Sequence, residues 1–513
     1  MSNAETQEQG YLGQSGFMPI FSQRAQSNPS LAHSSLQGLD VSALTVPRVL
    51  RQSYTETYLE FSFPWCPVLE QKDLLVHGPF ADSILLQQAL ALLGSIVNPP
   101  RLQHASSQTY YERMKMLFYR NHETNSLVRI IAITLVYWWS AGPPNLVSMD
   151  SQYWWNSVAV RMAQEIGLHR EVAADHVFRA GETASLRRRV WWTLFVSLLP
   201  RDVVPTLRYG QARERLTAIC QGRPCIIHPD DCNVRSPTIE DFPKDKASQA
   251  ELFINWVKIC AIVGDVSKHL VNRTESTPFP FDLAQRLIGW LPFSTGQSSY
   301  FDRHLYQLHL PYLAAITLLY MSPSAHPLPK AYTAAILSAS LVGRIFEDYL
   351  ARGHIRFLPG ISGWYISIAI LALLHARQVN GLRSEASEQI DILYVALKEI
   401  SKLWHSSKMF LVGFERLLTG SHLPSGRTST NAPAPSNGTT VSALNELAGE
   451  PGINYLDFFP TATTETSQLF RVLLTENPPN IFMGAEWAND LSMQLHDLFD
   501  QPFEDVDFDS LML

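Results

Sequence analysis

The sequence has little charge, and its balance is slightly acidic. Asp, Glu, Lys and Arg make up 17% of the 513 residues, against about 25% in an average soluble protein, whereas 46% of the residues are apolar. This composition indicates bulky, mostly buried elements rather than disorder along the whole chain. The net charge of -7 excludes an overall basic field that would hold nucleic acid by counterion release. Any contact with DNA must therefore be local or absent.

Cysteine is also scarce, and its spacing does not match the usual zinc motifs. The chain has five cysteines and no apolar signal segment after Met1, so we expect an intracellular protein without disulfides. Cys220, Cys225 and Cys232 lie close together with His228 between them, but no Cys-x-x-Cys pair occurs there. Structural zinc sites normally use such pairs, so we interpret these cysteines as semi-buried thiols and expect no metal or other cofactor in this chain.

Long hydrophobic runs are few. One long uncharged run, Phe357 to Leu374, carries the helix breakers Pro359, Gly360 and Gly363 near its start. It barely reaches the length that spans a bilayer. We therefore expect a buried helix here, a soluble protein and no contact with a membrane.

Helical periodicity is the main pattern between residues 46 and 418, and alternating strand patterns are nearly absent. Apolar residues recur at spacings of three and four, which places them on one stripe of a helix, as in Trp155, Ala159, Met162 and Ile166. Gly167 directly follows this stripe, at the position where a helix commonly ends with a residue in the left-handed conformation. The pattern predicts an all-α, multi-helix domain packed ridge into groove.

The composition divides the chain into four predicted segments. Residues 1–45 are a disordered lead-in, residues 46–420 a helical domain, residues 421–480 a mostly disordered linker and residues 481–513 an acidic, aromatic tail. The first part of the linker has too few apolar residues for their burial to offset the entropy lost on ordering the chain. Beyond Arg471 there is no Lys or Arg, and acidic residues alternate with aromatic and aliphatic ones.

Motifs for catalysis are missing. The sequence contains no phosphate-binding Gly-rich loop, paired-His zincin helix, dinucleotide fingerprint or Gly-x-Ser-x-Gly elbow. The sixteen histidines are scattered, and none is paired with a nucleophile. We assign no catalytic residue and expect a protein that is not an enzyme.

The most unusual local feature is the run Arg187, Arg188, Arg189, Val190, Trp191 and Trp192. One interpretation is a basic, aromatic patch that contacts phosphate. The alternative, which we favour because the chain is acidic and has no second basic cluster nearby, is a helix whose arginines cross-link acidic neighbours while its tryptophans enter the core.

Several ordered blocks of sequence resemble one family. The blocks are FSFPWCPVLEQKDL (61–74), GLHRE (167–171), RRRVWWTLF (187–195), CQGRPCIIHPDDCNV (220–234) and ALKEISKLWHSSKMFLVGFERLL (396–418). They are similar to the fungal-specific transcription factor domain, the middle homology region of binuclear zinc-cluster transcription factors, in its cutinase transcription factor branch. The positions carried over as family signature are Gly167, Leu168, His169, Arg187, Arg188, Arg189, Trp191, Trp192, Gly222, Arg223 and Pro224.

The resemblance implies a helical regulatory domain that acts in the nucleus on RNA polymerase II transcription. The tail is then interpreted as an activation segment. Its acidic charges repel one another and keep it solvated, so its apolar side chains remain available for burial in a groove of a coactivator. The side chains expected to make that contact are Trp487, Leu495, Phe499, Phe503 and Phe508. A merely solubilising tail is the alternative.

The chain departs from the family at two places. No cysteine precedes Cys66, so the six-cysteine zinc cluster is missing, and without zinc so small a module does not fold. We expect zinc only if a missing upstream cluster exists. Residues 196–211 interrupt a helical sequence pattern that would otherwise be continuous, as it is in the family. Pro200 and Pro205 would break the helix. Their codons can carry the favoured ends of an intron, so we interpret the segment as a retained intron.

The sequence therefore predicts a transcriptional regulator of the zinc-cluster family. Its expected partners are transcription coactivators, a DNA-binding partner or a second copy of the chain, and DNA only indirectly or through a missing N-terminal module. One alternative is a DNA-binding-deficient co-regulator or repressor that acts through a partner. An alternative of another class is an α-helical enzyme or small-molecule-binding protein.

Overall fold

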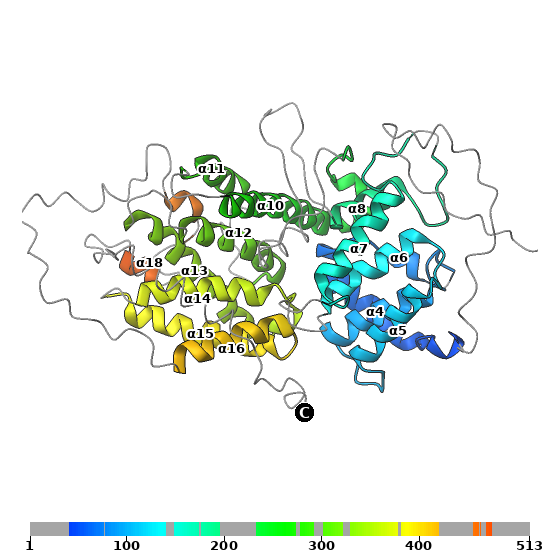
Figure 1. Ribbon diagram of the computed structural model, residues 1–513, viewed down its shortest axis with the longest axis horizontal. Helices are drawn as coiled ribbons and strands as arrows, with labels where there is room; N and C mark the ends of the chain where they lie inside the picture. The colour runs from blue at the N-terminus through cyan, green and yellow to red at the C-terminus, as the bar shows by residue number, and fades with distance from the viewer. Residues whose placement is uncertain are drawn as a thin grey trace, which may run out of the picture.

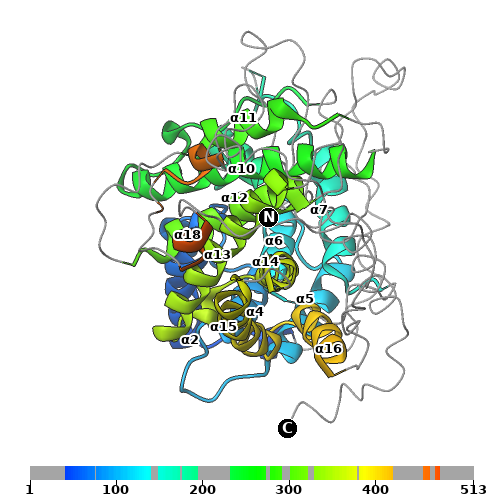
Figure 2. The same cartoon turned by 90° about the vertical axis from the view of Figure 1, so that its left-hand side faces the viewer.

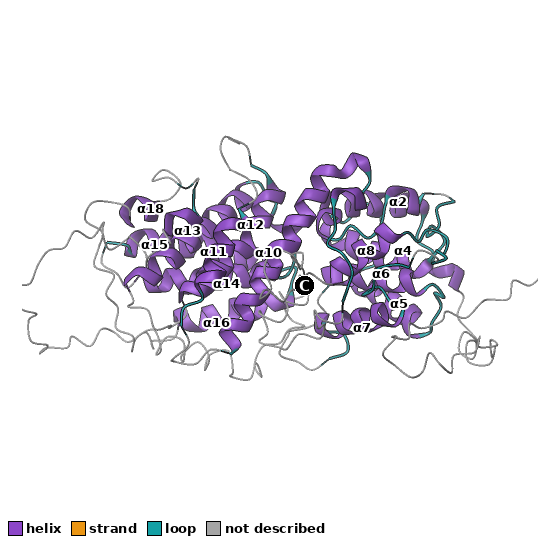
Figure 3. Ribbon diagram, turned by 90° about the horizontal axis from the view of Figure 1, so that it is seen from above, coloured by secondary structure: helices purple, strands orange, loops and turns teal. Residues whose placement is uncertain are grey.

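The computed structural model describes residues 41–75, 77–139, 148–173, 176–194, 232–272, 278–291, 301–321, 329–377, 381–419, 455–460, 462 and 468–473. Within these ranges every regular element is helical and none is a strand (Figure 3). The predicted all-α class is confirmed. The suspected insert at residues 196–211, the signature residues Gly222, Arg223 and Pro224, and the acidic tail lie outside the described residues.

The helices form two groups that lie side by side, with α10 reaching from the first to the second (Figure 1). The first group contains η2 Val41–Leu44, α2 Arg48–Thr57, η3 Tyr58–Ser62, η4 Phe63–Trp65, α3 Gln71–Leu74, α4 Ile84–Val97, α5 Ser107–Tyr119, α6 Ser126–Leu135, η5 Val136–Trp138, α7 Gln152–Glu165 and α8 Ala184–Leu194. The short η7 Ile239–Asp241 and η8 Lys244–Lys246 lead into α10 Ala247–Val271.

The second group follows α10. It contains α11 Phe281–Trp290, α12 Arg303–Met321, α13 Pro329–Ala351, η9 Ile355–Phe357, α14 Ser362–Arg377, α15 Arg383–Ser401, α16 His405–Thr419, η10 Tyr455–Phe458 and α18 Gln468–Leu473. Helices α10 and α11 cover α12 on one side, and α16 lies on the other side against α14 and α15 (Figure 2).

Helix α4 is the centre of the first group. Every residue of α4 after Ile84 is buried, and the Ser83 side chain caps its N-terminus by accepting a hydrogen bond from Leu86 N at 3.3 Å. Helix α2 crosses it closely because Gly94 has no side chain: a Cβ at that position would lie 2.2 Å from Cδ1 of Tyr54. An apolar helix with buried residues on all sides needs neighbours on all sides, and α2, α5 and α6 pack against α4.

Helix α14 has the same place in the second group. It contains most of the uncharged run from Phe357 to Leu374, and nearly all of its side chains are buried. Pro359 and Gly360 lie between η9 and α14, and Gly363 is the second residue of α14, so the helix begins after the proline. In the described part of the chain, no helix combines the length and the hydropathy needed to cross a membrane.

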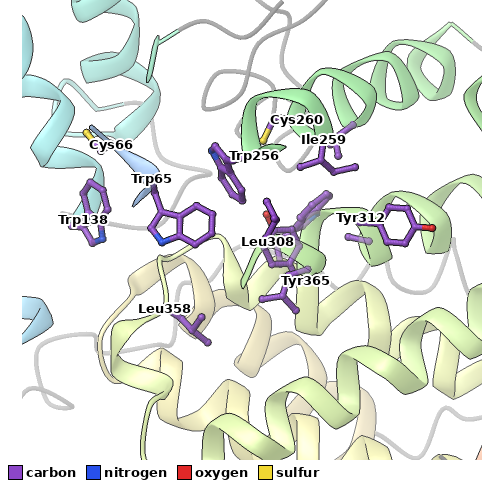
Figure 4. Close-up of a cluster of buried hydrophobic side chains, with 14 of the residues drawn as sticks. Trp65, Cys66, Trp138, Trp256, Ile259, Cys260, Leu308, Tyr312, Leu358 and Tyr365 are labelled. Carbon is purple, nitrogen blue, oxygen red and sulfur yellow. The ribbon is translucent and has the colours of Figure 1, made fainter. Parts of the chain in front are cut away.

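The two groups meet in an aromatic seam. Trp65 of η4 points toward Trp256 of α10 (Figure 4), with ring centroids 5.0 Å apart. Phe61 stacks on Phe357 at 4.3 Å, and the Arg303 guanidinium lies 4.4 Å from the centre of the Phe61 ring. Because these contacts join residues of the first group to α10, α12 and η9, movement of either group would disturb them.

Candidate functional site

The triple-arginine run lies on α8, and this helix is buried on all sides. Trp191 and Trp192 are completely inaccessible, and the three arginines are 2–8% exposed. Guanidinium groups so deeply buried need partners of opposite charge, since an unpaired buried charge costs several kcal/mol. The residues around α8 supply those partners.

Arg188 is held between two carboxylates. Its Nη1 donates to Asp241 of η7 and its Nη2 donates to Glu171. Asp241, whose side chain is 1% exposed, also accepts two hydrogen bonds of 3.1 Å from Nη1 and Nη2 of Arg235. The Asp241 carboxylate therefore joins two guanidinium groups from separate segments.

Arg189 and Arg187 extend the set of contacts in two further directions. Arg189 donates to Oε1 of Glu70 at 2.7 Å and to the backbone carbonyl of Asp241 at 2.6 Å. Arg187 donates to Oε1 of Glu182 at 2.5 Å and to the carbonyl of Ile166 at 2.8 Å. We call this set the arginine network; its charged members are Arg187, Arg188, Arg189, Arg235, Glu70, Glu171, Glu182 and Asp241.

The arginine network brings two of the predicted signature blocks together. Gly167 ends α7 with a φ of 69°, the left-handed conformation expected of a C-terminal cap. Leu168 N donates to Ala163 O at 2.8 Å, and the buried His169 ring lies 5.9 Å from the ring of Trp191. The block at 167–171 thus turns the chain so that Glu171 reaches α8.

The C-terminal end of another block, residues 220–234, and the residue directly after it contact these two blocks. Asn233 N donates to the carbonyl of His169 at 3.2 Å, and Trp192 Nε1 donates to the carbonyl of Arg235 at 2.7 Å. Cys232 is buried, whereas Cys220, Cys225 and His228 lie outside the described residues. In the described ranges, no group of His, Cys, Asp and Glu side chains is arranged to hold a metal ion.

A cavity of about 410 Å³ opens beside the network, and Glu70, Asp73, Thr183 and Arg189 are among the residues that line it. Burial opposes ionisation of Glu70, but hydrogen bonds and charges from Lys72 and Arg189 outweigh it and hold the pKa of Glu70 below its ordinary value. Burial raises the pKa of Asp73. The Asp73 carboxylate accepts a hydrogen bond from Glu70 N at 2.8 Å and so serves the local fold.

The network connects distant segments rather than presenting a reactive group. It links the residues before α3, the end of α7, helix α8 and the segment that starts α10. Its carboxylates are all engaged by arginines, and Glu70 also pairs with Nζ of Lys72 at 2.7 Å. Such an arrangement can fix the orientation of α8 against the start of α10.

Sequence reasoning did not identify the acidic members of the network. A local signal for one of them exists: Thr238 and Asp241 form a capping box, in which Thr238 N donates to Asp241 Oδ2 at 2.9 Å. The Thr-x-x-Asp spacing is typical of a helix start. It says nothing, however, about the pairing of Asp241 with Arg188, which lies 53 positions earlier.

Residues 55–197 match the family described as the fungal specific transcription factor domain. The match begins in α2 and runs through α8, so it includes the arginine run and the signature residues Gly167, Leu168 and His169. The resemblance predicted from the sequence blocks is confirmed.

Curated relatives match over a longer stretch. Cutinase transcription factor 1 alpha of Fusarium vanettenii is 23% identical over 417 residues, which cover 73% of this chain and 44% of that protein. The acetamidase regulatory proteins of Aspergillus oryzae and Aspergillus fumigatus are each 26% identical, over 73% of this chain and 49% of their own length. The chain thus spans about half the length of these relatives. No solved structure matches it significantly.

Proposed function

We propose, from the premise that residues 55–197 form a fungal specific transcription factor domain, that this chain is a transcriptional regulator. It acts in the nucleus on RNA polymerase II transcription. The observation that carries the proposal is the family match over the same helices that the arginine network holds together. The relatives, named as a cutinase transcription factor and acetamidase regulatory proteins, support regulation and count against catalysis.

The helical region would serve as a platform for protein contact. We assign residues 46–420 to this domain, residues 421–480 to a linker and residues 481–513 to an activation segment. The arginine network supports this assignment because it ties the residues before α3, the end of α7 and helix α8 to the segment that starts α10. A unit with fixed geometry can present the same surface to a partner in every molecule.

Contact with DNA would come from outside the residues of this sequence. No cysteine precedes Cys66, so the thiolates of a zinc cluster would have to be supplied by a module beyond this sequence, or DNA contact by a partner protein. A co-regulator or repressor that acts through such a partner is the alternative form of the proposal.

The tail provides the test that separates an activator from that alternative. Fused to a heterologous DNA-binding domain, residues 481–513 are expected to raise reporter transcription several-fold, because acidic charge keeps their apolar side chains available for burial in a coactivator groove. Replacing Trp487, Leu495, Phe499, Phe503 and Phe508 together with alanine is expected to abolish the effect.

A matched control changes polar residues of the same segment to alanine, namely Gln494, Gln501 and Ser510, and is expected to leave activation intact. A silent wild-type fusion, present at the same protein level, would contradict activation and favour the co-repressor.

A further inference from the structure

A second cavity, of about 560 Å³, lies between α2, the turn from α3 to α4, and α4. One stripe of α2 forms a wall of it. Arg48, Arg51 and Thr55 line this wall, and their spacings of three and four place them on one face of the helix. Leu59 of η3, the next element, lines the cavity as well. Leu50 and Tyr54 of α2 are buried in the core, and Tyr54 also contributes to the cavity lining.

The cavity is amphipathic. Leu59 and Phe80, with three leucines from α3 and α4, Leu74, Leu86 and Leu90, contribute apolar lining. Polar groups, including Gln52, Glu56 and Asp82, also line it. Its volume falls within the 300–1,000 Å³ that is typical of pockets for small organic molecules. A small number of polar groups above an apolar wall is the usual arrangement of such pockets.

Arg51 is the unusual member of this lining. Its side chain is half-buried, its Nε is inaccessible to solvent and has no hydrogen-bond partner, and no carboxylate among the described residues forms an ion pair with its guanidinium. The acidic residues near the rim do not compensate it: Glu56 accepts a hydrogen bond from Gln52 at 3.2 Å instead, and Asp82 is exposed. The three arginines of α8, in contrast, are each paired with a carboxylate.

The surroundings of Arg51 also favour the binding of an anion at this end of the cavity. Arg51 lies in the first turn of the ten-residue helix α2, which begins with Arg48 and has no acidic residue in that turn and no side-chain cap from Pro47. The helix dipole places partial positive charge at the same end. The two arginines and the helix end therefore add to a positive potential at this point, and among the described residues neither Glu56 nor Asp82, which also line the cavity, forms an ion pair with them.

We propose that this cavity binds an organic monocarboxylate with an apolar body, whose carboxylate pairs with Arg51 while the body lies against the leucines. The planar guanidinium matches a carboxylate in two parallel hydrogen bonds. A doubly charged phosphate fits less well, because the cavity offers one half-buried guanidinium and has Glu56 and Asp82 at its edge. The proposal goes beyond the regulatory function and holds whether or not the tail activates transcription.

The position of the cavity connects it to the arginine network. Leu75 and His77 line both this cavity and the one beside Arg189. His77 has a φ of 75°, a conformation that costs a residue other than glycine of order 1–3 kcal/mol. A ligand in the cavity would thus contact a strained turn whose other side faces Glu70 and Arg189.

The test is calorimetric titration of the purified full chain with 4-phenylbutyrate and with 4-phenylbutanol, which has the same apolar body and no charge. We expect the acid to bind at one site per chain and the alcohol to bind at least about tenfold more weakly, because it lacks the charge-assisted pair with Arg51. Equal affinities for the two probes, or no binding of the acid, would overturn the proposal.

Two substitutions locate the binding site. Arg51→Gln is expected to weaken the acid at least about tenfold and to leave the alcohol unchanged. Thr55→Glu, which offers Arg51 a carboxylate one turn away, is expected to do the same while keeping both arginines. Arg113→Gln on α5, outside the cavity lining, is the matched control. Wild-type affinity in both cavity variants, or an equal loss in the control, would contradict the assignment.

Discussion

Replacing Asp241 with alanine is expected to lower the free energy of unfolding by about 3–5 kcal/mol. The side chains of Asp241 and Arg188 are 1% and 7% exposed, so the substitution leaves a buried guanidinium without its main counterion. Arg235 loses its bidentate partner at the same time. Equilibrium denaturation of the full chain, followed by circular dichroism, measures the change.

A surface ion pair supplies the control. Lys402 and Glu399 pair at 2.6 Å, with side chains 59% and 44% exposed, and exposed pairs contribute about 0–1 kcal/mol. Glu399→Ala should therefore change stability little. Asp241→Leu combined with Arg188→Met should recover part of the loss, because it removes both buried charges, and the partners left behind, Arg235 and Glu171, have side chains that are 46% and 37% exposed. If Asp241→Ala were as mild as Glu399→Ala, the network would not hold α8 to the start of α10.

Adding one methyl group at Gly363 is expected to destabilise the second group of helices by about 1–3 kcal/mol. A Cβ at this position would lie 2.2 Å from Oγ and 3.2 Å from Cα of Ser407. Ser407 is completely buried, so its side chain cannot move aside into solvent. Helices α14 and α16 would have to separate, and thermal unfolding of Gly363→Ala would show the cost as a lower Tm.

Replacing glycine with alanine at another position should raise the free energy of unfolding instead of lowering it. Gly289 in α11 has no atom within 4 Å of its added Cβ, so Gly289→Ala should stabilise the protein by about 0.5–1 kcal/mol through better helix propensity. Ser407→Gly combined with Gly363→Ala should restore much of the lost stability. Equal effects at the two glycines would refute the close approach of α14 to α16.

Local features of the fold could be predicted from the sequence because short-range patterns encode them. The stripe that includes Trp155 and Ala159 is helix α7, and Gly167 adopts the left-handed cap that its position demanded. The uncharged run from Phe357 to Leu374 leads into a buried helix, α14. In each case the sequence within about twenty residues determines the result.

The pairings of the candidate site could not be predicted in this way. Arg189 pairs with Glu70, which lies 119 positions away in the sequence. Periodicity indicates which face of a helix is buried, but it does not indicate which carboxylate packs against that face. The cavity beside Arg51 is a similar case, since its wall combines three segments that are separate in the sequence. The signature blocks singled out α8 through resemblance, and the geometry then identified the acidic residues that explain its three arginines.

Reporter transcription by the full chain, tethered to DNA through a heterologous DNA-binding module, tests whether the chain activates transcription through residues 481–513. We expect a clear rise over the module alone and a return to that baseline when the chain ends at residue 480. A full-length fusion that accumulates in the nucleus and leaves the reporter unchanged would contradict it.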